Sequence, residues 1–173
     1  MKHLFLLFSC CVLLANAQKP ALVTRVVDGD TYDLFYNSKR VRARIAHIDA
    51  PELKQAFGKS SALQVSQLLN HRIVIFDSLG KDLYGRVVGN LLLNGKRVDS
   101  LLVRSGIAWY NPAYGEDLLL ASCMLQAVSE GKGLWTCGTE LVCPPWLYRT
   151  YNYENRLRYC RGCSVNNQST FKN

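Results

Sequence analysis

Short runs of alternating apolar and polar residues, separated by turn residues, fill the first half of the chain. This period-two pattern is typical of β-strands that bury one face. Strands are expected over five segments: 21–27, 32–36, 39–48, 72–76 and 87–93. The third segment is unusual because arginines 40, 42 and 44 alternate with small and apolar residues, so one face of that strand is expected to carry arginine.

Apolar positions spaced three and four apart predict three helices. One starts near Ser60 or Ser61, a short one follows Asp99 and ends before Gly106, and a third covers about 116–130. In the third helix the spacing predicts that four residues face inward: Leu118, Ala121, Leu125 and Val128.

These elements predict an α+β, mainly β fold. The expected architecture is a five-stranded Greek-key barrel of the OB-fold type with about three helices, plus a cysteine-rich C-terminal extension. The alternative is a generic α+β sandwich.

The N-terminus has the features of a secretory signal. Lys2 precedes the apolar run Leu4–Leu14 and the small-residue motif Ala15-Asn16-Ala17, which predicts cleavage after Ala17. The expected organisation is a signal peptide over 1–17, an OB-fold domain over 18–136 and the extension over 137–173. The protein is expected to be secreted or periplasmic, monomeric and not membrane-bound.

Composition favours a polyanionic partner. The formal charge of +8 becomes +7 once Lys2 is removed with the signal, and a basic excess on a small domain favours nucleic acid, anionic membranes or acidic glycans.

Five cysteines follow the signal, and an oxidising compartment favours disulfides. The disulfide candidates are Cys137, Cys143, Cys160 and Cys163. The alternative for these four is zinc, although their first pair is spaced more widely than usual zinc ligands. Cys123 lies in the third helix, where a buried small hydrophobe is expected.

Acidic residues gather in two turns that antiparallel pairing is expected to bring to one end of the barrel. Asp28 and Asp30 flank Gly29, and Asp49 and Glu52 follow the arginine-faced strand. Oxygen ligands of this kind suit a hard cation such as calcium. Guanidinium groups match phosphate oxygens, so Arg44 and Arg86 complete what a phosphodiester-cleaving site requires.

Three blocks carry a family resemblance: D28-G29-D30-T31, R44-I-A-H-I-D49-A-P51-E52 and Y84-G85-R86. In this order they resemble the thermonuclease family, the staphylococcal nuclease-like proteins. The resemblance covers about 21–135, including G-L-W at 133–135, and leaves the extension uncovered.

The resemblance implies a role for each matching residue. Asp30, Asp49 and the backbone carbonyl of Ala50 would bind Ca²⁺. Arg44, Glu52 and Arg86 would be catalytic, with Asp28 and Thr31 supporting the turn and the metal site. The implied reaction is hydrolysis of DNA and RNA with little sequence preference, leaving 3′-phosphate ends.

Further residues are candidates for contacting the nucleic acid. Tyr84 and one of Tyr110 or Tyr114 are expected to stack on bases, since an aromatic face accepts any base. Lys54 and Lys59 are expected to guide the substrate electrostatically.

The sequence leaves more than one interpretation open for the extension and for the function of the chain. Arginines and aromatic residues interleave over 146–161, which suits either a surface for single strands or a stapled segment packed on the barrel. The chain is either a nuclease, a barrel that binds nucleic acid without cutting it, or a disulfide-rich adhesion or envelope protein. The third alternative leaves the acid and arginine pattern unexplained.

Overall fold

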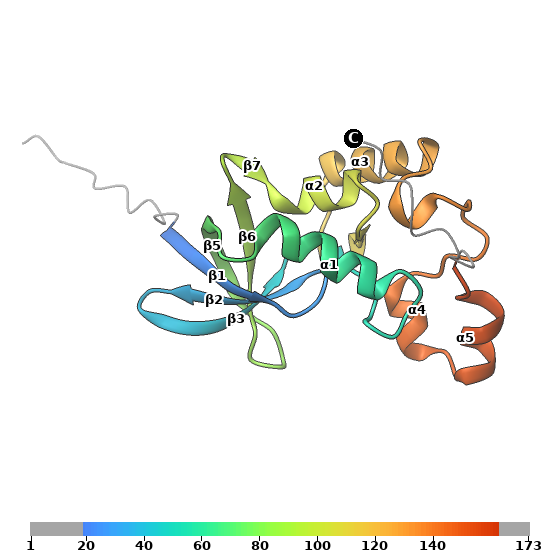
Figure 1. Cartoon of the computed structure of the whole chain (residues 1–173), viewed down its shortest axis with the longest axis horizontal. Helices are drawn as coiled ribbons and strands as arrows, with labels where there is room; N and C mark the ends of the chain where they lie inside the picture. The colour runs from blue at the N-terminus through green and yellow to red at the C-terminus, as the bar shows by residue number, and fades with distance from the viewer. Residues whose placement is uncertain (1–18, 163–173) are drawn as a thin grey trace, which may run out of the picture.

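A closed β-barrel forms one end of the molecule in the computed structural model, which describes residues 19–162 (Figure 1). Its strands are β1 (Lys19–Val26), β2 (Thr31–Tyr36), β3 (Lys39–Ile45), β5 (Ile73–Lys81) and β6 (Val87–Leu93). They pair antiparallel in the order β3-β2-β1-β5-β6, and a parallel pairing of β3 with β6 closes the barrel. The predicted five-stranded OB-type barrel is therefore confirmed, and the sandwich alternative is wrong.

The third predicted strand is broken near its end. β3 stops at Ile45, and His47 adopts a positive φ of 62°. The chain then forms the short strand β4 (Ile48–Asp49), which pairs with β8 (Trp109–Tyr110) outside the barrel. This turn takes Asp49 away from the barrel wall and places it in a second, two-stranded sheet formed by β4 and β8.

The barrel core is filled from the strands and from α1 (Gly58–Leu69). Many of the largest fully buried side chains come from these two sources: Tyr32, Phe76, Leu34, Ile45, Leu69, Leu91, Val23 and Val65. A buried aliphatic or aromatic side chain of this size contributes roughly 1.5–3 kcal/mol, so α1 is held by its apolar face.

The start of α1 differs from the expectation. The helix begins at Gly58, and Phe57 precedes it in a left-handed conformation without a side-chain cap. Ser61, one of the expected caps, is instead buried and donates a hydrogen bond to the carbonyl of Ile107 at 3.1 Å. A Cβ on Gly58 would lie 1.9 Å from the carbonyl oxygen of Glu52, so the helix begins directly against that loop.

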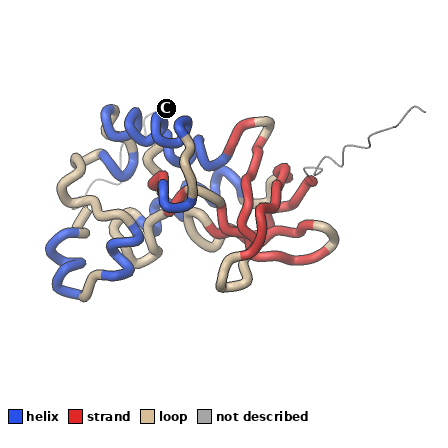
Figure 2. The backbone as a smooth tube through the Cα atoms, turned by 180° about the vertical axis from the view of Figure 1, so that it is seen from behind, coloured by secondary structure: helices blue, strands red, loops and turns tan. Residues whose placement is uncertain are grey.

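After β6, the Asn94-Gly95 turn leads through β7 (Lys96–Arg97) into α2 (Val98–Arg104). A 3₁₀ turn, η1 (Pro112–Tyr114), precedes α3 (Leu118–Ser129), and η2 (Gly133–Trp135) follows it. Figure 2 shows the strands gathered at one end of the molecule and most helices over the other.

The predicted inward face of α3 is confirmed for Ala121 and Val128, which are partly buried against the core, and is wrong for its two leucines. Leu118 and Leu125 are 87% and 69% exposed, whereas Leu120, Cys123 and Ala127 are buried. Apolar residues of α3 lie on nearly every side of the helix, so their spacing does not select the face that is buried. Cys123 is a buried free thiol, as expected.

The extension forms two helices that the sequence pattern did not predict. These are α4 (Pro145–Thr150) and α5 (Tyr153–Tyr159), which a disulfide between Cys143 and Cys160 closes into a hairpin. Cys137 is also disulfide-bonded. The disulfide prediction is thus confirmed for these three cysteines, which excludes the zinc alternative for them. Cys163 and the predicted signal peptide lie outside the described residues.

The α4–α5 hairpin lies beside the N-terminal end of α1, away from the barrel strands (Figure 1). Within residues 19–162, none of the helices has the length and hydrophobicity needed to cross a bilayer.

Candidate active site

One pocket of about 420 Å³ collects most of the residues singled out from the sequence. The charged groups come from the turn before β2, the end of β3, β4 with the loop after it, the loop before β6, and α4. The lining residues are Asp28, Asp30, Arg44, Asp49, Ala50, Pro51, Glu52, Tyr84, Arg86, Tyr114 and Arg149.

The Asp28-Gly29-Asp30 turn places two carboxylates in this pocket. The backbone N–H of Asp30 donates to Asp28 Oδ1 at 3.0 Å, and Thr31 Oγ1 donates to Asp30 Oδ1 at 3.0 Å. A Cβ on Gly29 would lie 2.3 Å from Ser61 Oγ and 2.5 Å from Ala50 Cβ. Glycine is required because the turn packs tightly against α1 and the loop of Asp49.

Asp30 is buried, and both of its carboxylate oxygens accept hydrogen bonds. Its Oδ2 accepts the backbone N–H of Ala50 at 2.6 Å, and its Oδ1 lies 3.1 Å from Arg44 Nε. Burial raises the pKa of Asp30 to about 7, with the nearby charges of Asp28 and Asp49 acting in the same direction, while Arg44 and the Ala50 N–H oppose the rise.

Arg44 joins Asp30 to the second buried carboxylate, Asp49. Its Nη2 donates to Asp49 Oδ1 at 3.1 Å and its Nη1 donates to the Ile45 carbonyl at 2.6 Å. Asp49 is only 1% exposed. One guanidinium therefore fixes the relative position of two carboxylates that come from different loops.

The acidic groups suit a hard divalent ion if the backbone contributes. Among residues 19–162, no group of three His, Cys, Asp or Glu side chains is arranged to hold a metal by itself. Asp30, Asp49 and Ala50 line the same pocket, and two carboxylates with a carbonyl and water form a set of oxygen ligands that calcium accepts. The residues present therefore fit such an ion.

Glu52 and Arg86 line this pocket from two different loops. The backbone N–H of Glu52 donates to Gln55 Oε1 at 3.1 Å, which fixes the loop that carries its side chain. Arg86 Nε donates to Asp82 Oδ2 at 2.7 Å, and Arg86 Nη1 lies 3.4 Å from Thr31 Oγ1. The guanidinium is thus positioned by its neighbours at the pocket wall.

The candidate nucleic-acid contacts divide into two groups. Tyr84 and Tyr114 line the pocket and are exposed, with their rings 5.5 Å from the Arg86 guanidinium and 6.0 Å from that of Arg44. Tyr110 does not line it, since its buried hydroxyl donates to the Gly115 carbonyl and accepts the Asp117 N–H.

The two candidate lysines lie in different places relative to the pocket. Lys54 lines an adjoining pocket, and Lys59 is exposed on α1 and lines neither.

Arg149, from the extension, was not among the predicted site residues. Its Nη2 lies 2.7 Å from Asp49 Oδ2 and its Nη1 lies 2.8 Å from Glu52 Oε1. Hydrogen bonding to Asp49 raises the pKa of Arg149 further above its usual value, so it stays charged. The interleaved arginines of the extension indicated that such a contact was possible. The sequence could not show which arginine makes it, because this depends on how the hairpin packs against the rest of the chain.

Comparison with known proteins identifies the family of this chain. Residues 42–137 match the family described as Staphylococcal nuclease homologue. The chain belongs to the staphylococcal nuclease family.

Relatives carry names that state the activity. An "Uncharacterized endonuclease" of Escherichia coli is 35% identical over 144 residues, covering 83% of this chain and 92% of that protein. The "Micrococcal nuclease" of Shigella flexneri is 30% identical over 138 residues, covering 73% of this chain and 78% of that protein. "Staphylococcal-like nuclease CAN1" of Arabidopsis thaliana is 30% identical over 112 residues, which is 65% of this chain and 34% of that one.

The thermonuclease-like prediction is therefore confirmed. The protein is a nuclease, a hydrolase whose substrate is nucleic acid, and nucleases of this family generally depend on a metal ion.

Proposed function

We propose that this nuclease is exported and uses Ca²⁺ to hydrolyse DNA and RNA with little sequence preference, leaving 3′-phosphate ends. The observation that carries the proposal is the convergence of Asp30, Asp49, Arg44, Glu52 and Arg86 on one pocket. No smaller subset would supply the ion ligands, the water-directing carboxylate and the phosphate-binding groups together.

The metal would be held by Asp30, Asp49 and the Ala50 carbonyl. When bound, calcium supplies positive charge that polarises a phosphoryl oxygen. Asp30 and Asp49 must both be ionised to hold it, and the Arg44 guanidinium between them stabilises the two negative charges at short range.

Glu52 and the two family arginines would carry out hydrolysis. Glu52 accepts a proton from water as the water oxygen bonds to phosphorus, and the bond from phosphorus to the 5′ oxygen breaks. Arg44 and Arg86 stabilise the charge that grows on the phosphoryl oxygens. The 5′ oxygen takes up a proton, so the products are a 3′-phosphate and a 5′-hydroxyl.

Low sequence preference follows from the contacts available to the base. Tyr84 and Tyr114 offer exposed aromatic rings at the pocket. Stacking on a ring contributes roughly 1–3 kcal/mol per base and accepts every base.

The test is cleavage of plasmid DNA, single-stranded DNA and RNA by the mature protein, with calcium, with magnesium or with a chelator. Calcium-dependent loss of all three substrates, with 3′-phosphate ends on the fragments, supports the proposal. Equal activity in the chelator, or fragments with 3′-hydroxyl ends, contradicts it. Arg86→Ala tests whether the described pocket is responsible for cleavage. If it is, the variant loses activity on the same substrates that wild type no longer cleaves when the metal is removed.

Export has its own test. The N-terminal sequence of protein recovered outside the cytoplasm should begin at Gln18. A protein that retains Met1–Ala17 and stays in the cytoplasm would contradict this part of the proposal.

A further inference from the structure

A second pocket of about 440 Å³ continues from the catalytic pocket toward the α4–α5 hairpin. It shares three residues with the first, namely Asp28, Glu52 and Arg149. The other residues that matter here are Lys54, Tyr148 and Arg156. Because the two pockets share these lining residues they adjoin, so a chain-like substrate held in the first would extend toward the second.

The hairpin that lines this second pocket is fixed to the loop after Glu52. Gln55 Nε2 donates to the Cys143 carbonyl at 2.7 Å, and Tyr148 Oη donates to the Lys54 carbonyl at 3.1 Å. The disulfide from Cys143 to Cys160 closes the base of the hairpin. Its arginines are thus held in place before any substrate arrives, which lowers the entropic cost of using them.

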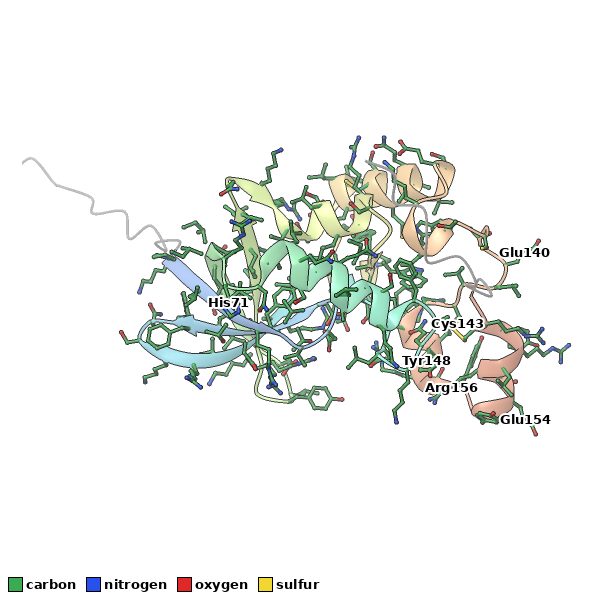
Figure 3. All side chains as sticks on the ribbon, in the orientation of Figure 1. His71, Glu140, Cys143, Tyr148, Glu154 and Arg156 are labelled. Atoms are coloured by element: carbon green, nitrogen blue, oxygen red, sulfur yellow. A yellow bond between two sulfur atoms is a disulfide. The ribbon has the colours of Figure 1, made fainter. Side chains whose placement is uncertain are left out.

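Arg156 is positioned by Tyr148. Its Nε donates to the Tyr148 carbonyl at 2.8 Å, and its guanidinium carbon lies 4.4 Å from the centre of the Tyr148 ring. Figure 3 labels both side chains and shows them close together between α4 and α5. A guanidinium stacked on a ring keeps its planar donor edges for an anion.

Arg149 lies at the boundary of the two pockets. It pairs with Asp49 and Glu52, yet 44% of its side chain is exposed. Asp49 is buried and accepts hydrogen bonds from Arg149 at both carboxylate oxygens, so that pair is firmly held, whereas the pair with Glu52 is exposed on both sides and weak, about 0–1 kcal/mol. A substrate phosphate therefore competes most easily with Glu52 for the exposed side of the Arg149 guanidinium. Arg149 occupies Asp49 Oδ2, an oxygen of the proposed metal ligand set, and a shift of Arg149 toward a substrate phosphate would release that oxygen.

We propose that the α4–α5 hairpin forms a phosphate-binding subsite for the nucleic acid strand whose cleaved bond lies in the catalytic pocket. Arg149, Arg156 and Lys54 bind a backbone phosphate that flanks the cleaved one. Three cations face two carboxylates in this pocket, which favours an anion. The inference rests on the proposed function, since it assigns the extension a part in binding the same substrate.

The first test measures binding without cleavage. A fluorescent single-stranded oligonucleotide is titrated in the presence of chelator over a series of salt concentrations, using wild type, Arg149→Ala, Arg156→Ala and Arg158→Ala. Arg158 is the matched control because it lies on α5 beside Tyr159 and lines neither pocket. When a protein neutralises one phosphate fewer on a single strand, the steepness of log K against log salt falls by about 0.7.

The expected result is a slope that is shallower by about 0.7 in Arg149→Ala and Arg156→Ala and unchanged in Arg158→Ala. Arg156→Lys should restore the slope while keeping weaker affinity, because lysine supplies the charge without the fork. Melting temperatures confirm that each variant is folded. Unchanged slopes in both alanine variants would overturn the proposal.

The second test distinguishes a substrate-binding subsite from an inhibitory latch, in which Arg149 would only block Asp49 and Glu52 and would bind no phosphate. With calcium present, Arg149→Ala should raise KM for the oligonucleotide and leave KM for a dinucleotide close to wild type, since a dinucleotide does not reach the second pocket. A variant that binds calcium more tightly by calorimetry, cuts both substrates faster and keeps the wild-type salt slope would show a latch and overturn the proposal. The chelator experiment needs no catalysis, so its failure is distinct from failure of the calcium-dependent reaction.

Discussion

Single side chains at this site serve several neighbours at once, and Arg44 is the clearest case. Alternation along β3 predicted that arginines 40, 42 and 44 share a face, yet only Arg44 is buried. It is buried because the DGD turn and β4 cover the end of β3 at that position. Its bonds to Asp30 and Asp49 make it both a structural tie and a candidate phosphate ligand.

At the residue scale, Asp49→Asn tests the metal ligand set. The substitution removes the charge shared by Arg44 and Arg149, so calcium affinity measured by calorimetry should fall by at least about 10-fold, the lower end of what even outer contacts to a metal contribute. Asp33→Asn is the matched control, because Asp33 also pairs with two arginines but lines neither pocket. Retained calcium affinity in Asp49→Asn would place the ion elsewhere.

The strands of the barrel were predictable where the sequence pattern agreed with only one choice of element and boundaries. Strand 87–93 agrees with β6 residue for residue because it is a short apolar run closed by the strong turn signal Asn94-Gly95. The start of α1 was not predictable, since its cap is a left-handed Phe57 chosen by the packing of Gly58 on the loop of Glu52. Long-range packing decides such boundaries, and local propensity does not report it.

Gly58→Ala tests that contact at the element scale. A Cβ would meet the Glu52 carbonyl at 1.9 Å, so the loop or the helix must shift. We expect a loss of about 1–3 kcal/mol in the free energy of unfolding by urea, together with a lower kcat because Glu52 moves. Leu63→Ala, at an exposed position of the same helix, should change the free energy by no more than about 0.5 kcal/mol. Equal stability and kcat in Gly58→Ala and wild type would show that this contact does not fix Glu52.

At the scale of the whole molecule, the barrel and the adjoining β4 loop supply the acids and two arginines, and a disulfide-closed hairpin adds a third arginine. The acids and the two barrel arginines were visible in sequence because three motif blocks follow one another in a fixed order. The placement of Arg149 was not visible, since neither the helices of the extension nor their docking on Lys54 and Gln55 leaves a periodic signal.

Removal of the disulfide tests how the hairpin is maintained. The bond links residues 17 positions apart, and closing a loop of that size stabilises by about 3 kcal/mol in the chain-entropy model. In Cys143→Ser/Cys160→Ser we expect faster hydrogen exchange of α4 and α5 amides, with the barrel amides as the internal control. Unchanged protection of the hairpin would show that its packing suffices without the bond.

Glu52→Gln tests most directly whether this one pocket performs the hydrolysis. Glutamine keeps the size and one acceptor oxygen, so Arg149 retains a partner, but it accepts no proton from water. Under saturating calcium, the single-turnover rate of DNA cleavage should fall by about 10²–10⁴-fold, the usual contribution of a general base, while Arg158→Ala stays at the wild-type rate. A Glu52→Gln rate within a few-fold of wild type would contradict the assignment of catalysis to this site.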